Sequence, residues 1–378
     1  MSKARAKILQ CLAAICVAAL LLPAVAFGQY KQTNLVSDTG TDGAVMDSNL
    51  VNGWGLVSSP TSPFWVSDNN TGKSTLYSIS NTAQGVTASK LGLVVTIPAA
   101  SSGTGSPTGV VFNGTGDFVV TDPTTAKSAK ALFIFSTLDG TISGWNPAVG
   151  PGGNTATIAA NRSDVGAEYS GLAVGSVNDG GVIRNFLYAP DNGPNRRVDV
   201  FDGHFQLVQP GTDGLDPQAF EDAGIPKKFA PYGIQTICQG ADCQIWVTYT
   251  ALDKAESGFV DLFATDGKLL RHFALRGPLH SPWGIALAPA NFGPMSNAIL
   301  ITNNISRGRI EAFDPNSGAY LGPLRDAGNK PIEIDGIWAI QFGQGAGANG
   351  QTNQLFFTAG PSDYANGLFG VISFQGGE

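Results

Sequence analysis

Four polar residues stand just before short apolar runs that recur along the chain: Asn52, Glu168, His280 and Asp335. Their two carboxylates and one amide offer hard oxygen ligands, of which Ca²⁺ takes roughly six to eight. A Ca²⁺ ion held by Asn52, Glu168 and Asp335 would act as a Lewis acid on an ester or lactone, and His280 would serve as a general base. These residues allow a calcium-dependent hydrolase, provided that the fold brings them together.

More Asp and Asn residues follow a second set of apolar runs, where turns are expected. If the fold places them on the same face as the first four residues, they would surround a common ligand site. These residue types are also ordinary turn residues, because their side chains bond their own backbone and they tolerate a left-handed φ. The sequence leaves both interpretations open for Asp68, Asn69, Asn70, Asp122, Asp191, Asn192, Asn303, Asn304 and Asp363.

Sharper catalytic motifs are not found: the chain has no G-x-S-x-G, H-E-x-x-H, phosphate-loop or C-x-x-C-H sequence. This argues against serine hydrolases, zinc proteases, nucleotide enzymes and heme attachment. His204, in an expected turn, and His272, on an expected outer strand, are interpreted as structural or solvent-facing. The leading hypothesis is therefore a binding or scaffold protein that engages a protein, peptide, carbohydrate or small molecule through its loops, with the calcium-dependent hydrolase as the alternative.

The elements that must position these residues come from a repeat. A short apolar strand begins six times, near Trp54, Thr108, Ser170, Tyr232, Trp283 and Trp338. A second strand follows each time and ends in a small or hydroxyl residue, beginning at Phe64, Phe118, Phe186, Ile245, Ile299 and Leu355. A third, alternating strand then leads into a hairpin and a fourth strand, with hairpin turns at Asp139-Gly140, Asp202-Gly203, Asp266-Gly267 and Asn316-Ser317-Gly318.

Six repeats of four antiparallel strands predict an all-β, six-bladed β-propeller. No helical pattern interrupts them, and a β-sandwich, the structural rival, would not need the same pattern six times. The sixth repeat lacks its fourth strand, which we expect residues 30–36 to supply, closing the ring. Trp54, Trp283 and Trp338 would either stack on a flat ligand or pack between blades.

Two of the repeats carry a family resemblance. One runs Tyr188-Ala189-Pro190-Asp191-Asn192 and then Arg197-Val198-Asp199-Val200-Phe201-Asp202-Gly203, and Ile301 to Asp314 repeats this form. It resembles NHL-type propeller repeats. The segments Phe133 to Pro147 and Gly277 to Pro289 are similar to a largely uncharacterised family of exported bacterial propellers. Some of its members carry a C-terminal sorting tail, which is not expected here. The resemblance implies a fold and no established activity.

A second resemblance concerns the possible metal. The Glu, Asp and Asn residues at the starts of inner strands are similar in type to the axial calcium ligands of lactonase and phosphotriesterase propellers. The local motifs around those ligands are not found, so only the residue types of Glu168, Asp335 and Asn52 match. Calcium is therefore the one cofactor that the sequence suggests.

The N-terminus has the pattern of a secretory signal. Lys3, Arg5 and Lys7 precede an apolar run at residues 8–22 and an Ala24-Val25-Ala26 sequence. We expect a signal peptide at residues 1–28, cleaved after Ala26 or Gly28, and one propeller domain at 29–378; a retained anchor is the alternative. Cleavage leaves 19 basic and 29 acidic residues, a balance that argues against nucleic acid and anionic lipid as partners. We expect an exported, periplasmic or extracellular monomer without stable membrane insertion.

Two cysteines lie beyond the expected signal peptide, Cys238 and Cys243. They flank Gln-Gly-Ala-Asp between two apolar runs, as in a hairpin. Exported proteins meet an oxidising compartment, so we predict a disulfide across this hairpin. Free thiols are the alternative, and a metal site lacks other Cys or His residues nearby.

Overall fold

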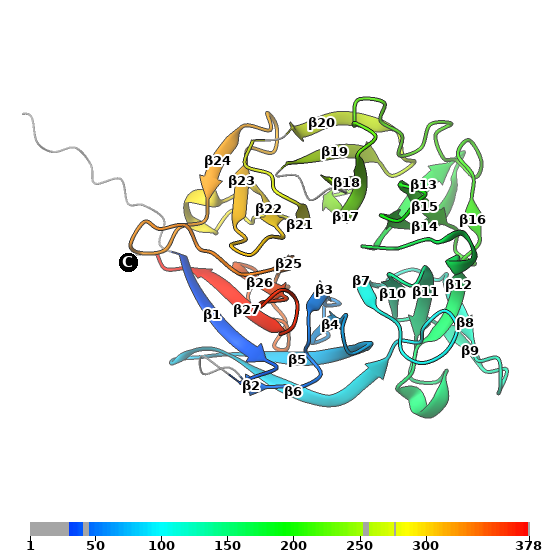
Figure 1. Cartoon of the computed structure of the whole chain (residues 1–378), viewed down its shortest axis with the longest axis horizontal. Helices are drawn as coiled ribbons and strands as arrows, with labels where there is room; N and C mark the ends of the chain where they lie inside the picture. The colour runs from blue at the N-terminus through cyan, green and yellow to red at the C-terminus, as the bar shows by residue number, and fades with distance from the viewer. Residues whose placement is uncertain (1–29, 41–44, 252–256, 276, 377–378) are drawn as a thin grey trace, which may run out of the picture.

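The computed structural model describes residues 30–40, 45–251, 257–275 and 277–376, and the expected signal peptide lies outside them. Six four-stranded antiparallel blades form a closed ring, which confirms the predicted six-bladed β-propeller (Figure 1). Helical structure in the described residues is limited to three 3₁₀ turns, at Pro151–Gly153, Ser163–Val165 and Gly293–Met295. Functional side chains must therefore come from strands and from the loops between them.

Within each blade, the first strand lies nearest the axis and the last lies at the rim. Blades one to three consist of β3 (Gly53–Val57), β4 (Phe64–Asp68), β5 (Lys73–Thr82) and β6 (Gly85–Thr96); β7 (Pro107–Phe112), β10 (Phe133–Thr137), β11 (Thr141–Trp145) and β12 (Thr157–Asn161); and β13 (Ala173–Asp179), β14 (Val182–Asp191), β15 (Arg197–Phe201) and β16 (Leu207–Val208). Blades four to six consist of β17 (Phe229–Gln239), β18 (Asp242–Ala251), β19 (Gly258–Ala264) and β20 (Leu269–Leu275); β21 (Pro282–Leu287), β22 (Ile299–Asn303), β23 (Ile310–Phe313) and β24 (Tyr320–Pro323); and β25 (Ile337–Phe342), β26 (Gln354–Ala359), β27 (Leu368–Phe374) and β1 (Tyr30–Ser37).

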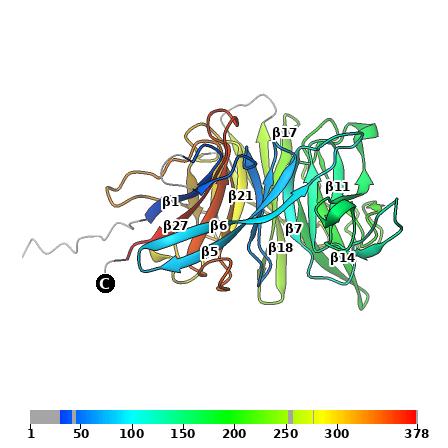
Figure 2. The same cartoon turned by 90° about the horizontal axis from the view of Figure 1, so that it is seen from below.

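The ring closes through the N-terminal strand, as predicted. β1 pairs antiparallel with β27, from Tyr30 opposite Phe374 to Ser37 opposite Leu368, and in the side view the two lie beside the long β5–β6 ribbon (Figure 2). Tyr30 fastens this strand to blade five, because its hydroxyl donates to the Phe292 carbonyl at 2.7 Å. Burial raises the pKa of Tyr30 to about 12, so the phenol stays neutral and able to donate. β2 (Val45–Met46) adds a short parallel pairing to β1.

Blade two departs from the predicted strand order. The expected second strand at Phe118–Thr121 was wrong: Val119–Thr121 (β8) pairs with Ser128–Lys130 (β9) in a separate two-stranded sheet. β10 takes the second position beside β7. The Asp139-Gly140 turn therefore joins strands two and three of this blade rather than three and four. An apolar run of this length can form a strand of a separate hairpin outside the blade as readily as a strand of the blade itself.

The predicted disulfide is present. Cys238 and Cys243 face each other across the β17–β18 hairpin and are bonded to one another.

The core of the molecule lies in apolar clusters between neighbouring blades. Between blades three and four, for example, Phe186 and Tyr188 pack in one cluster with Phe263. Each blade thus buries side chains on both faces, which requires a closed ring.

Two repeated residue types hold neighbouring inner strands together. A Cβ atom at Gly233 would lie 2.0 Å from the Trp283 carbonyl oxygen, so only glycine lets these two strands approach. In the next blade, Thr302 Oγ1 accepts from the Gly284 amide at 2.7 Å and donates to the Trp338 carbonyl at 2.8 Å. The glycine of the inner strand and the hydroxyl at the end of the second strand are therefore explained by contact between blades.

Candidate functional site

The loop face is the end of the ring where the loops before the inner strands meet the loops between strands two and three. Three of the asparagines predicted at the ligand face hold neighbouring blades together there. The side-chain amide of each donates to a backbone carbonyl at the start of the next blade's inner strand. These bonds run from Asn69 to Pro107 at 3.1 Å, from Asn192 to Pro231 at 3.1 Å and from Asn304 to Ile337 at 3.2 Å. The Nδ2 groups of these residues are thus committed to joining blades.

In blades three and five, the residue before such an amide accepts a bond from the backbone that leads into its own inner strand. Asp191 Oδ1 accepts from the Glu168 amide at 2.9 Å. Asn303 Oδ1 accepts from the His280 amide at 2.9 Å. The equivalent residue of blade two is Asp139, which accepts from Ser106 at 2.6 Å and was not among the predicted site residues. Asp191 and Asn303 thereby fix the backbone positions of two predicted ligand residues, Glu168 and His280.

Asp122 does not lie with these loop-face residues, so its predicted placement between strands two and three of blade two was wrong. Its Oδ1 accepts from the Thr124 amide at 2.8 Å in the turn between β8 and β9. Those backbone bonds lower the pKa of Asp122, as expected for a turn residue.

In blade six, Asp363 has a φ of 54°, and Asp335 Oδ2 accepts from the Ser362 amide at 2.8 Å.

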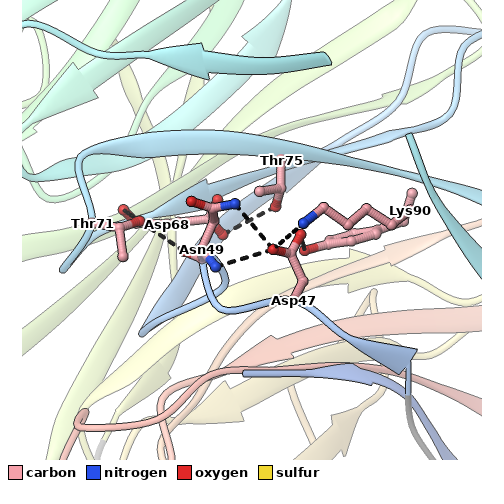
Figure 3. Close-up of polar contacts among 7 residues, drawn as sticks. Asp47, Asn49, Asp68, Thr71, Thr75 and Lys90 are labelled. Atoms are coloured by element: carbon pink, nitrogen blue, oxygen red, sulfur yellow. Dashed lines mark hydrogen bonds and ion pairs between the residues drawn. The ribbon is translucent and has the colours of Figure 1, made fainter. Parts of the chain in front are cut away.

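Asp68 ends β4 beneath the loop face and is fully buried. Its Oδ1 accepts from Thr75 at 3.2 Å, whereas no hydrogen bond from the described residues reaches its Oδ2. Figure 3 shows the neighbouring Asp47, whose carboxylate contacts the Lys90 ammonium at 2.6 Å. Burial, and then the charge of Asp47, raise the pKa of Asp68 well above its usual value. Asp68 is thus a carboxyl group that the fold favours in its protonated form.

Aromatic rings fill the axis just inside the loop face. Trp54 stacks on Trp338 with ring centroids 3.5 Å apart, and Trp283 meets both edge-on. Tyr232 and Tyr364 lie against the same group. We call these five residues the aromatic plug. The three tryptophans are at most 8% exposed, so they pack between blades, which agrees with the second of their two sequence interpretations.

The predicted calcium ligands have different surroundings. Asn52 Oδ1 accepts from the Trp338 indole at 2.8 Å, and its Nδ2 donates to Asn69 and Asn70. Glu168 is exposed and Asp335 half-buried. Within the described chain, no hydrogen bond joins any two of Asn52, Glu168 and Asp335. Below the plug the axial cavity is only about 20 Å³, about one water molecule. A calcium site on the axis thus remains a prediction.

A larger cavity of about 630 Å³ lies along blade five, and His280 lines it. Glu311 forms part of its wall and accepts from the Tyr320 hydroxyl at 2.6 Å. Burial raises the pKa of Glu311. Arg307 and Arg309 stand at this cavity and both reach the Glu333 carboxylate. His280 thus faces a mixed polar and aromatic cavity.

A second cavity, of about 500 Å³, is lined by residues of blades three and four. Arg196, Arg197 and Lys227 give it a basic wall, and Phe229 and Tyr249 an aromatic one. The Arg196 side chain donates to the Lys227 carbonyl at 3.0 Å, which ties the loop between β14 and β15 to the segment before β17. No sequence motif pointed to this cavity, because its residues come from segments far apart in the chain.

Next to this cavity lies a cluster that the sequence did not predict: Asp222, Asp261 and His272. Burial, and then contact with Asp222, raise the pKa of Asp261 to about 7. Hydrogen bonding to Asp261 raises the pKa of His272, which is therefore not merely solvent-facing. One signal was available in the sequence: Asp261 interrupts the otherwise apolar run Phe259-Val260-Asp261-Leu262-Phe263, and a buried carboxylate needs a partner. His204, in contrast, is exposed.

Fold and cavities define the chain as a six-bladed propeller with ligand-sized hollows at its loop face. Uncharacterized protein R648 and Uncharacterized protein L690 of Acanthamoeba polyphaga mimivirus are each 30% identical to it over 365 residues. Both alignments cover 93% of this chain, with 82% and 87% of the viral proteins. Uncharacterized protein R640 of the same virus is 30% identical over 228 residues, 57% of this chain and 38% of that protein. The chain belongs to the family of R648 and L690.

No family model matches the chain. Among solved structures, the Dos1 propeller has a TM-score of 0.37 at 10% identity, covering 82% of this chain and 69% of that one. The COPII outer coat vertex on membranes has a TM-score of 0.43 at 10% identity, covering 82% and 66%. These likenesses concern the fold alone. None of the helices in the described residues is long and apolar enough to cross a membrane.

Proposed function

We propose that this chain is an exported binding propeller that engages a protein, peptide or carbohydrate ligand through the loop face of blades three to five. The observation that carries the proposal is the pair of cavities of about 500 and 630 Å³. Both include residues that precede an inner strand and residues from a loop between strands two and three. Their sizes fall in the usual range for ligand sites.

The chemistry of these cavities favours an acidic ligand. Five basic residues line them, Arg196, Arg197, Lys227, Arg307 and Arg309, against three acidic ones, Glu221, Asp222 and Glu311, although the whole chain carries a formal net charge of −7. Arg307 and Arg309 are paired with Glu333, which an acidic ligand would have to displace. Arginine and aromatic residues together are typical of the centres of binding surfaces. The excess of basic side chains at these cavities would attract an acidic peptide segment or an acidic carbohydrate and disfavour basic ligands.

Export is the second part of the proposal. It is supported by the charged and apolar pattern of residues 1–28 and by the Cys238–Cys243 disulfide, since such bonds persist mainly in oxidising compartments. The resemblance to NHL-type repeats and to exported bacterial propellers remains a prediction from sequence, as does the monomeric state.

The test is an array of acidic peptides and acidic glycans, probed with the wild-type protein and two double variants. Ile305→Ala/Arg307→Ala changes the blade-five cavity. Ile183→Ala/Arg184→Ala changes a comparable pair on the β13–β14 hairpin, at the opposite end of the ring. We expect the cavity variant to bind its best ligand roughly tenfold more weakly, which equals about 1.4 kcal/mol. The hairpin variant should bind like wild type. Equal binding by both variants, or none by wild type, would contradict the proposal.

A further inference from the structure

The inference concerns the cluster of Asp222, Asp261 and His272 in blade four, and it is independent of the proposed function. Asp261 on β19 stands directly opposite His272 on β20. The pairing shifts register on both sides of Asp261, an irregularity that re-aims side chains. Asp222 arrives from the segment between β16 and β17. Gly224 packs closely against the cluster, since a Cβ there would lie 3.3 Å from His272 Cε1.

The geometry of the cluster suits a metal ion. His272 Nδ1 lies 3.1 Å from Asp222 Oδ2 and 3.2 Å from Asp261 Oδ1. These separations are close to the roughly 3.3 Å edge of a tetrahedron whose metal–ligand bonds are about 2.0–2.1 Å long. One ligand atom from each of the three residues lies within 4.8 Å of the others. A single N–H on Nδ1 cannot satisfy both carboxylates.

A buried oxygen without a hydrogen bond gives a second, independent observation. Asp261 is fully buried, and the Asp222 side chain is 5% exposed. Among the described residues no hydrogen bond reaches Asp261 Oδ2, whereas Asp222 Oδ2 has the 3.1 Å contact with His272 Nδ1. An unpaired buried carboxylate oxygen is costly, and a cation would relieve this cost at Asp261. His272 is 45% exposed, which leaves a route for an ion from solvent.

Neighbouring blades show how the same position is satisfied without a metal. The third strands of blades three and five carry the buried acids Asp199 and Glu311, at the position of Asp261. Asp199 accepts from Arg197 and from the Tyr169 hydroxyl, so each of its oxygens has a donor. Glu311 accepts from Tyr320. Blade four alone among these three places a second carboxylate and an imidazole beside its acid.

We propose that Asp222, Asp261 and His272 form a binding site for a divalent transition-metal ion of the Zn²⁺ type. Two carboxylates and one imidazole are ligands that zinc takes, and three protein ligands leave a fourth position for water. Asp222 also lines the 500 Å³ cavity, so the open position lies next to a space that a second ligand can enter.

The test uses the purified protein without a histidine tag, freed of metal by a chelator and titrated with Zn²⁺, Mn²⁺ and Ca²⁺ by calorimetry. We expect one Zn²⁺ per chain, bound in preference to Ca²⁺, and a rise in melting temperature that depends on zinc concentration. Asp261→Asn and His272→Gln should each weaken zinc binding by at least roughly tenfold.

Matched controls use equivalent residues. Asp199→Asn changes the corresponding acid of blade three, and His204→Gln an exposed histidine; both should leave zinc affinity unchanged. Circular dichroism of each metal-free variant verifies folding. Should Asp261→Asn fail to fold, His272→Gln decides alone, because its side chain is half exposed. No stoichiometric zinc, preference for Ca²⁺, or equal affinity in His272→Gln and His204→Gln would overturn the proposal.

Discussion

The contacts between blades near the axis and the cavities of the loop face use polar residues in different ways. Near the axis, polar groups recur from blade to blade and bond to the next blade, as Asn69, Asn192 and Asn304 do. The charged residues that line the cavities of blades three to five differ from one cavity to the other. Repetition in this ring therefore marks structure, and departure from the repeat marks the places where a ligand can bind.

The largest effect should come from an inner-strand glycine. Gly233→Ala places a Cβ against the Trp283 carbonyl, and we expect a loss of roughly 3 kcal/mol or more of unfolding free energy, or failure to fold. Gly92→Ala is the control, since a Cβ there meets no atom of the described residues within 4 Å. Urea unfolding measures both. Similar stability of the two variants would show that the axial strands have more room than their contacts indicate.

A bridging hydroxyl should have the next largest effect. Thr302→Val keeps the shape of the side chain and leaves the Gly284 amide and the Trp338 carbonyl without their shared partner. We expect a loss of about 1–3 kcal/mol in urea unfolding. The exposed Thr121, whose hydroxyl bonds to the Ser128 hydroxyl, provides the control variant Thr121→Val. If Thr302→Val unfolds at the same urea concentration as wild type, the hydroxyl does not hold the blades together.

Asp68→Asn tests a buried acid close to the axis through its pH dependence. The pKa of Asp68 is raised in the folded protein, so its contribution to stability is greatest below the unfolded value near pH 4 and is lost as pH rises toward the folded value. The variant should therefore be more stable than wild type at pH 8, with the difference shrinking toward pH 4.

Urea unfolding at a series of pH values measures this difference, and Asp122→Asn is its control. The pKa of Asp122 is lowered, so its contribution is lost as pH falls and the sign of the effect is reversed. A constant difference between Asp68→Asn and wild type at all pH values would show that Asp68 does not change its proton affinity on folding.

The smallest effect on stability is expected at the blade-five cavity. Arg307 is 77% exposed and paired with Glu333, and exposed ion pairs contribute little. Arg307→Ala should leave the urea unfolding curve unchanged while weakening the binding of an acidic ligand. A variant that is destabilised but binds normally would place Arg307 among the structural residues and weaken the contrast between the axis and the cavities.

The repeat made most of the fold predictable. An inner-strand glycine, a hydroxyl near the end of the second strand and a hairpin turn recur in most blades, so six blades and the closing strand at Tyr30 followed from the sequence. Blade two was misread because the β8–β9 excursion begins with a run that resembles a second strand. That error also placed Asp122 in the wrong loop, and it left Asp139, which bonds the backbone before β7, out of the predicted site residues.

The candidate site was less predictable for a physical reason. Asp222, Asp261 and His272 come from three segments, and only sheet register and a covering loop bring them together. Residues such as Asn192 and Asn304 attracted attention because they repeat, and the structure shows that repetition reflects contact between blades. A lone acid in an apolar strand, as at Asp261, was the better signal.

The closing strand has a consequence for how the chain is made. β1 is synthesised first and its partner β27 last, so the ring cannot close until nearly all of the chain has emerged. Until then the outer edge of β27 and both edges of β1 can pair with other chains. Such distant pairing is also slow to form. The strand that seals the finished ring is thus the one that leaves the growing chain most open to aggregation.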